Sequence, residues 1–145
     1  MYVLIRNWTS GWIGTLHTAR MVNLLPATTY YYRVGDGASK WSEVFHFTTL
    51  DPRADSLTFA IIGDMDYGAN SDATIASLKR LLDDKKIHAV VHSGDISYAD
   101  GFEPHWDDFF NKIEPIAARI PYMGSPGNSS ICDCIAFEMD GEYCS

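Results

Sequence analysis

The feature that most constrains the fold is an apolar run ending in Gly-Asp that occurs twice, about thirty residues apart. The first run ends at Gly63-Asp64 and the second at Gly94-Asp95. The pattern predicts a strand, a crossover helix and a second parallel strand. Ligands of open α/β sheets bind beyond the carboxyl ends of the strands. The two aspartates are therefore expected at one edge of a sheet, on strands roughly 4.8 Å apart, where they could share a pair of metal ions.

The segment between the two runs has the spacing of an amphipathic helix. Ile75, Leu78, Leu81 and Leu82 recur at helical intervals. Residues 70–72, Asn-Ser-Asp, supply N-cap chemistry, and the lysines at 85–86 suit the negative end of a helix dipole. We therefore expect a helix between them.

The pattern continues as α/β structure up to residue 128. A strand is expected over 88–91, and a helix from about Pro104 to Ala118, which Pro115 should kink or end. A short third strand is expected over 120–123. If it joins the same sheet with a right-handed crossover, Asn128 comes to the edge that carries the two aspartates.

Residues 1–50 have the period-two pattern of β structure instead. Alternation over 24–34 and over 41–49 predicts two strands, with Asp36-Gly37 as a turn. The approach Leu-x-Pro-x-Thr-x-Tyr is similar to the tyrosine corner of fibronectin-type sandwiches. Such a sandwich needs about seven strands and about 100 residues. The pattern predicts roughly half of one, followed by a polar linker over 51–56.

Composition narrows the possible partners of the chain. With 145 residues, 46% of them hydrophobic, it can form one ordinary domain or two small pieces. A net charge of -8 argues against nucleic acid as a partner, and no apolar run approaches the roughly 18 residues of a membrane span.

The first residues do not form a signal peptide, so either the protein is cytosolic or the chain begins downstream of its natural start. The cysteines at 132, 134 and 144 fit no standard disulfide framework, and a zinc site would need a fourth ligand.

The residues at the predicted sheet edge are candidate metal ligands. Asp64 and Asp95 offer hard oxygen donors, and one carboxylate can bridge two cations. Tyr98 follows Asp95 by three residues and can face the same cation. A phenol is a poor ligand for Zn²⁺ or Mg²⁺ at neutral pH, whereas a trivalent iron would ionise it. Asn128 could bind a second cation through its side-chain carbonyl.

The ordered set of Gly-Asp, Gly-Asp-x-x-Tyr and Gly-Asn resembles the first three metal motifs of the purple acid phosphatases, a branch of the metallophosphoesterases. The sequences of residues 92–100 and 106–128 are similar to those of the family as well. Residues 10–12 and 29–36 resemble its N-terminal sandwich domain. The resemblance covers about residues 8–128.

The resemblance implies a fold: the α/β metallophosphoesterase-like N-terminal half, βαβαβ with a mostly parallel sheet, preceded by part of a fibronectin-III-like β-sandwich. The sandwich part would occupy residues 1–50, with the linker over 51–56. The phosphoesterase part would occupy 57–128, and 129–145 reads as a divergent tail. The chain would thus be a purple acid phosphatase shortened at both ends.

The resemblance also implies a function, the hydrolysis of phosphomonoesters by an acid phosphatase with a dinuclear centre. That centre would hold Fe(III) and a divalent zinc, manganese or iron ion, and a metal-activated hydroxide would attack the substrate. Asp64 and Tyr98 would bind the ferric ion, Asp95 would bridge, and Asn128 would bind the divalent ion. The family is typically secreted or vacuolar/lysosomal. The resemblance sets neither the oligomeric state nor the physiological substrate.

The sequence departs from the family at four places. Asp66 replaces a glycine of the first motif, and Ser129 stands where the family has a substrate-facing histidine, so no catalytic residue is identified. None of the five histidines lies in the family's two later motifs. His88 and His92, four residues apart on a strand, are expected to be structural.

Two alternatives follow from these departures. The chain could be a non-catalytic remnant that binds one metal or none. It could also be a haloacid-dehalogenase-like phosphatase, because Asp64-x-Asp66 after an apolar strand mimics the nucleophile and acid/base pair of that family. Gly68 stands where that family expects threonine or valine, and the family does not explain Asp95-x-x-Tyr98.

Overall fold

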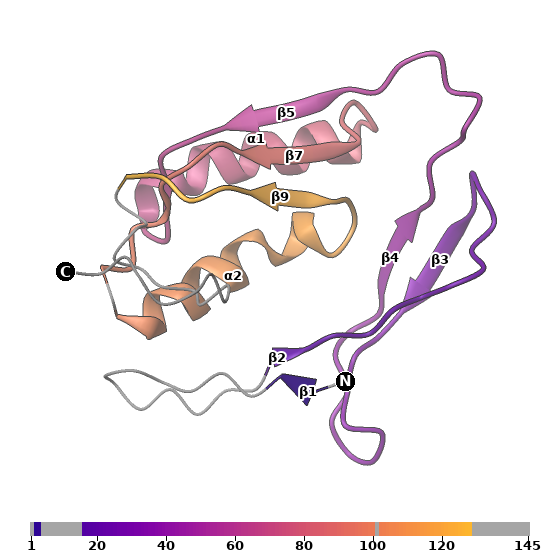
Figure 1. The fold of residues 1–145 in the computed structure, drawn as a ribbon, viewed down its shortest axis with the longest axis horizontal. Helices are drawn as coiled ribbons and strands as arrows, with labels where there is room; N and C mark the ends of the chain where they lie inside the picture. The colour runs from indigo at the N-terminus through magenta and orange to yellow at the C-terminus, as the bar shows by residue number, and fades with distance from the viewer. Residues whose placement is uncertain (1, 4–15, 101, 129–145) are drawn as a thin grey trace.

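A computed structural model of the chain describes residues 2–3, 16–100 and 102–128. The elements follow one another as an N-terminal β part and a C-terminal α/β part (Figure 1). The β part contains β1 (Tyr2–Val3), β2 (Leu16–His17), β3 (Thr29–Tyr32) and β4 (Phe45–Thr48). The α/β part contains β5 (Phe59–Ile62), β6 (Met65–Asp66), the 3-10 turn η1 (Ala69–Ser71), α1 (Asp72–Asp83), β7 (Ala89–His92), β8 (Ile96–Ser97), α2 (Glu103–Ala117) and β9 (Tyr122–Gly124).

The central feature of the α/β part is a three-stranded parallel sheet in the order β5-β7-β9. Its register aligns the carboxyl ends, since Ile62 pairs with His92 and His92 pairs with Gly124. The loops after β5, β7 and β9 therefore leave the sheet at one edge, which we call the carboxyl edge (Figure 1). The predicted parallel sheet is confirmed.

Both helices pack against one face of this sheet. Ile75, Leu78 and Leu82 of α1 join Phe109, Ile113 and Ile116 of α2 in a buried core beneath Val90. Ala60, Ile62 and Tyr122 pack against the same core from the strands. Alternation along β5 turns Phe59 and Ile61 to the other face, where Ile61 is 72% exposed.

The β3–β4 hairpin presents a half-buried aromatic face. Tyr30 stacks on Phe47 with ring centroids 5.8 Å apart, while His46 and Thr48 point to the exposed side, as the alternation predicted. The backbone N–H of Leu25 donates to Tyr30 Oη at 2.8 Å. This is the kind of contact that a tyrosine corner makes. The wider fibronectin-type sandwich stays a prediction.

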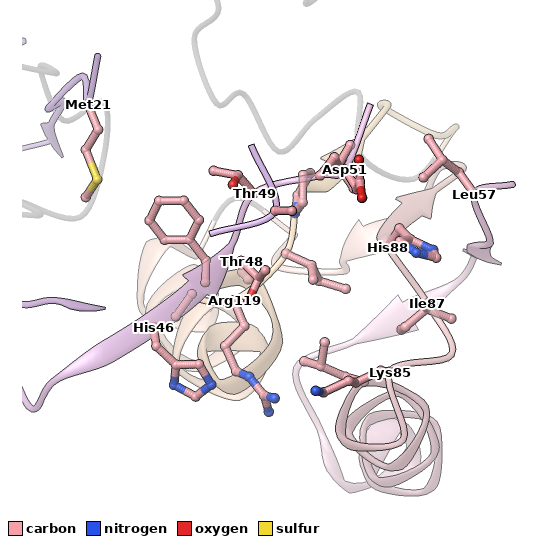
Figure 2. Close-up of a pocket in the computed structure, with 18 of the residues that line it drawn as sticks. Met21, His46, Thr48, Thr49, Asp51, Leu57, Lys85, Ile87, His88 and Arg119 are labelled. Carbon is pink, nitrogen blue, oxygen red and sulfur yellow. The ribbon is translucent and has the colours of Figure 1, made fainter. Parts of the chain in front are cut away.

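The hairpin contacts the α/β part at the sheet edge opposite the carboxyl edge. Tyr32 Oη donates to the carbonyl of Ala118, just after α2, at 2.8 Å. A cavity of about 830 Å³ lies at this junction (Figure 2). Its walls come from the hairpin, from Leu50 to Leu57 and from the residues that precede β7 and β9. None of the residues that line this cavity is Asp64 or Asp95.

Two details of the helices differ from expectation. The Ser71 side chain makes no cap hydrogen bond to α1, because its hydroxyl donates back to Asp66 instead. Helix α2 runs through Pro115 and ends at Ala117, so the proline lies in the last turn and does not end the helix where it stands. No helix among the described residues is long and apolar enough to cross a bilayer.

Candidate metal centre

Three of the four predicted ligands meet at the carboxyl edge. Tyr98 Oη donates to Asp64 Oδ1 at 2.7 Å and lies 3.3 Å from Asp95 Oδ2. The hydrogen bond to Asp64, supported by the two negative carboxylates, raises the pKa of Tyr98 above its usual range. In the absence of a cation the phenol therefore keeps its proton and donates it to Asp64, with the Asp95 carboxylate close by.

A second, very short parallel pairing holds the two Gly-Asp turns together. Strands β6 and β8 pair with Met65 opposite Ile96. Just before them, the N–H of Asp64 donates to the carbonyl of Gly94, and the N–H of Met65 donates to the carbonyl of Asp95, both at 3.2 Å. These backbone bonds fix the loop after β5 against the loop after β7. The two carboxylates are thus placed by backbone geometry.

The same loops contain an unusual number of left-handed residues. Eight non-glycine residues of the described chain have positive φ. Five of them lie here, with φ between 49° and 67°: Asp64, Asp95, Ser97, Tyr98 and Asp100. This conformation costs an L-residue about 1–2 kcal/mol. Such strain clusters at active sites and ligand clamps.

The loop after β9 reaches the centre through its backbone. A Cβ on Gly127 would lie 2.1 Å from Asp95 Oδ1 and 2.2 Å from Asp95 N. Only glycine therefore allows this close approach. Asn128 comes next and is exposed. The third strand does bring residue 127 to the edge of Asp95, whereas the ligand role of Asn128 stays a prediction.

Asp66, which replaces the family's glycine, is engaged by its own loop. Its carboxylate accepts from the N–H of Gly68 at 3.0 Å and from Ser71 Oγ at 2.5 Å. The Nζ of Lys112 on α2 contacts the carbonyl of Gly68 and forms an ion pair with Asp72. Asp66 thus organises the turn into α1. The sequence signal for it was Asp-x-Gly-x-x-Ser, a typical side-chain-to-backbone turn.

The described histidines of the α/β part each have contacts of their own. His88 Nδ1 accepts from the N–H of Thr58 at 3.0 Å, and His105 stacks on Tyr67 with centroids 3.8 Å apart. His92 is fully buried, with Nδ1 3.0 Å from Tyr122 Oη. Among the described residues no group of three or more His, Cys, Asp or Glu could hold a metal ion. The cysteines at 132, 134 and 144, and Ser129, lie outside the described residues.

The donor set fits one half of a two-metal site. Two carboxylates and a phenol within hydrogen-bond reach of one another are hard oxygen ligands, and the phenol is a donor that suits a trivalent cation. For a second cation the described residues offer Asn128 and a bridging carboxylate. The fit is therefore good on the side of Asp64 and Tyr98 and incomplete on the other.

Comparison with known proteins identifies the class. The family model of the calcineurin-like phosphoesterases matches residues 57–140, more than half of the chain. The match continues past residue 128, where the resemblance read from the sequence stops. The chain belongs to this family. The family model of the purple acid phosphatase N-terminal domain matches residues 4–49.

Individual relatives narrow the class to the purple acid phosphatases. The chain is 39% identical to "Probable inactive purple acid phosphatase 1" of Arabidopsis thaliana, over 83% of this chain and 22% of that protein. It is 37% identical to "Acid phosphatase type 7" of Homo sapiens, over 78% of this chain and 26% of that protein. The structure of purple acid phosphatase PPD1 from yellow lupin seeds is similar at a TM-score of 0.59 and 32% identity, over 73% of this chain and 21% of that one. The chain is a member of the purple acid phosphatase group.

The chain spans about a quarter or less of the length of these relatives. Several of the Arabidopsis relatives carry the word "inactive" in their names. Membership therefore establishes a phosphatase family, and that family implies a dinuclear metal site. The activity of this chain is a separate question.

Proposed function

We propose that the chain carries the ferric half of a purple acid phosphatase centre, whose function is the hydrolysis of phosphomonoesters. The observation that carries the proposal is the meeting of Tyr98 with Asp64 and Asp95. In this proposal Asp64 and Tyr98 would hold Fe(III), Asp95 would serve both cations, and Asn128 would hold zinc, manganese or divalent iron. We also propose four segments: a fibronectin-III-like part over 1–50, a linker over 51–56, a phosphoesterase part over 57–128 and a divergent tail over 129–145.

The chain's own residues would prepare the site in two ways. The phenolic proton of Tyr98, now shared with Asp64, must leave when a cation binds, so metal uptake releases a proton. The β6–β8 pairing keeps the carboxylates of Asp64 and Asp95 adjacent before any cation arrives, which lowers the cost of assembling the site. Two bound cations supply Lewis acidity toward the phosphoryl oxygens and the attacking water.

A second candidate is a non-catalytic chain with a partial metal site. Ser129 in place of the family's histidine favours it, as do the relatives named inactive. The haloacid-dehalogenase alternative loses support, because the Asp66 carboxylate is bound by Gly68 and Ser71 and the family match is to calcineurin-like phosphoesterases.

Loading the purified chain with Fe(III) and Zn²⁺ tests both candidates. A violet absorption band and hydrolysis of p-nitrophenyl phosphate at about pH 5 support the phosphatase, provided that Tyr98→Phe abolishes the band. The matched control is Tyr31→Phe, which removes the hydroxyl of a tyrosine that is 73% exposed on the hairpin and should leave the band unchanged.

Colour without turnover would establish the second candidate, a half-built site. A colourless and inactive chain would exclude the proposed ferric site. Turnover with Mg²⁺ that is lost in Asp64→Asn but unaffected by Tyr98→Phe would restore the haloacid-dehalogenase alternative.

A further inference from the structure

The cavity between the β3–β4 hairpin and the α/β part has walls from both parts (Figure 2). Its volume of about 830 Å³ is typical of a small-molecule site, and such sites occur preferentially at interfaces between domains. None of the residues that line it is a proposed metal ligand. The metal chemistry therefore does not account for this cavity.

Hydrogen bonds within the chain hold both walls of the cavity in place. Tyr32 Oη on β3 donates to the carbonyl of Ala118 at 2.8 Å, which joins the hairpin to the end of α2. The N–H of His88 donates to the carbonyl of Thr58 at 2.8 Å, and the N–H of Thr58 donates back to His88 Nδ1 at 3.0 Å. The cavity is thus formed before any ligand binds, as is usual for small-molecule sites.

Most of the side chains that line the cavity are apolar. Ile87 and Ile120 line it from the α/β part, and Phe47 lines it from the hairpin. The segment that joins the two parts adds Leu50 and Leu57, which are 51% and 44% exposed. Single exposed leucines need no explanation, whereas exposed leucines gathered at one hollow indicate a surface for an apolar partner.

The charged residues of the lining leave one positive charge without a partner. Asp51 is bonded to Arg53 at 3.1 Å, and Arg119 is bonded to Asp83 at 2.6 Å. Lys85 also lines the cavity, and it forms no ion pair with any residue that the structure describes. A chain with a net charge of -8 thus has an uncompensated cation at its largest described cavity.

The polar groups around this cation are hydrogen-bond donors. Figure 2 shows the nitrogen-bearing ends of Lys85, Arg119 and His46 on the same side of the cavity, with Asp51 on the other side. His88 Nδ1 accepts a hydrogen bond, so the ring hydrogen of His88 lies on Nε2. That Nε2 makes no hydrogen bond to any described residue. Donors and a cation beside apolar walls suit a molecule that combines an acidic group with an apolar body.

We propose that this cavity binds one small amphipathic anion, an apolar molecule with a single carboxylate or similar acidic group. Its apolar body would lie against Leu50 and Leu57, and its acidic group toward Lys85 and Arg119. The ligand would contact both walls and so hold the hairpin to the α/β part. This inference is independent of the proposed function, because it uses none of the proposed metal ligands. The competing explanation is a cleft that only water fills.

The first experiment uses decanoate as the probe, because it joins an apolar chain to one carboxylate. Amide ¹H–¹⁵N spectra of the chain should show saturable shifts at Thr49, Leu57 and His88, and hydrogen exchange of the hairpin amides should slow. Decyltrimethylammonium has the same tail with the opposite charge, and acetate has the charge without the tail. Each should bind about tenfold or more weakly than decanoate.

Three results of this titration would overturn the proposal. The first is the lack of a saturable shift at the cavity walls, and the second is a shift of amides throughout the chain. The third is binding of either control probe as tight as that of decanoate. Binding to phosphatidylglycerol vesicles without binding of free decanoate would equally overturn it, in favour of a membrane surface.

The second experiment compares matched variants of the apolar wall. Leu57→Asp should abolish decanoate binding, because it places a like charge in the wall. Val44→Asp makes the same kind of change at a hairpin residue that is 61% exposed and does not line the cavity, and it should leave binding unchanged. Far-UV circular dichroism checks that both variants fold. Undiminished decanoate binding by folded Leu57→Asp would contradict the proposed site.

A second pair of variants tests the cation. Lys85→Gln should weaken decanoate binding about two- to fivefold, because an exposed charge pair contributes little. The control is Lys86→Gln, since Lys86 does not line the cavity and pairs with Asp84 at 2.9 Å. It should bind decanoate like the wild type. Equal effects of the two lysine variants would overturn the assignment of the acidic group to Lys85.

Discussion

The α/β part and the β3–β4 hairpin are held together in different ways. Every buried residue of the described chain lies between Met65 and Ile116, in the α/β part. The aromatic residues that face one another across the hairpin are only half-buried. An isolated two-stranded hairpin is at best marginally stable in water. The comparison indicates that the α/β part supplies most of the stability and that the hairpin depends on what it contacts.

The largest expected effect comes from removing the centre of the α/β core. Phe109→Ala should lower the free energy of unfolding by about 3–5 kcal/mol, because Phe109 is 1% exposed and its loss leaves a cavity. Phe47→Ala on the hairpin should cost about 1 kcal/mol or less. Urea denaturation followed by circular dichroism measures both. Equal losses would show that the hairpin belongs to the same core.

A smaller effect is expected at the loop that touches Asp95. Gly127→Ala would place a methyl group against Asp95, and overpacking of this kind costs about 1–3 kcal/mol. It should also abolish iron binding if Asp95 is a ligand. Gly37→Ala is the control in the hairpin turn. Its Cβ would meet no atom within 4 Å, so only the positive φ of 81° opposes it. Iron bound normally by Gly127→Ala would argue against the site.

A hydrogen bond links the hairpin to the α/β part. Tyr32→Phe removes the donor to the Ala118 carbonyl and should cost about 0.5–1.5 kcal/mol. Hydrogen exchange should show faster opening of the hairpin amides, with the amides of β7 unchanged. Faster exchange in β7 as well would mean that hairpin and sheet open together.

The smallest expected effect is a local dependence on pH in the hairpin turn. The N–H groups of Lys40, Ala38 and Ser39 donate to Asp36 and hold the pKa of its carboxyl well below the usual range. A depressed folded pKa stabilises the turn above the unfolded value of about 4, and this contribution is lost as the pH falls through the folded value. Amide shifts of residues 38–40 should therefore change only in strong acid.

Asp36→Ala is the control for this pH dependence. Its amide shifts at residues 38–40 should stay flat over the same range, and the core amides should not respond in either protein. A response of the wild-type core amides at the same pH would show that the turn is coupled to the α/β part.

The sheet and the meeting of Asp64, Asp95 and Tyr98 were predictable from sequence, because parallel strands ending in Gly-Asp have few alternative arrangements. The roles of Asp66 and Ser71 were not predicted, although the Asp-x-Gly-x-x-Ser pattern is compatible with such a turn. Both side chains bond to one another instead of to a cation or a helix end, and local side-chain bonds of this kind compete with the caps that a pattern predicts. The close approach of Gly127 to Asp95 was not predicted either, because a glycine after a proline is typical of an ordinary turn.

The left-handed residues at the carboxyl edge have a consequence for laboratory evolution. Heat resistance selected without activity should favour glycine or asparagine where a strained residue makes no contribution to the site, beginning with the exposed Asp100. Positions 64, 95 and 98 would resist such replacement only in selections that also demand metal. A pair of evolution experiments, one with iron and one without, would thus distinguish the left-handed residues that metal binding requires from those that it does not require.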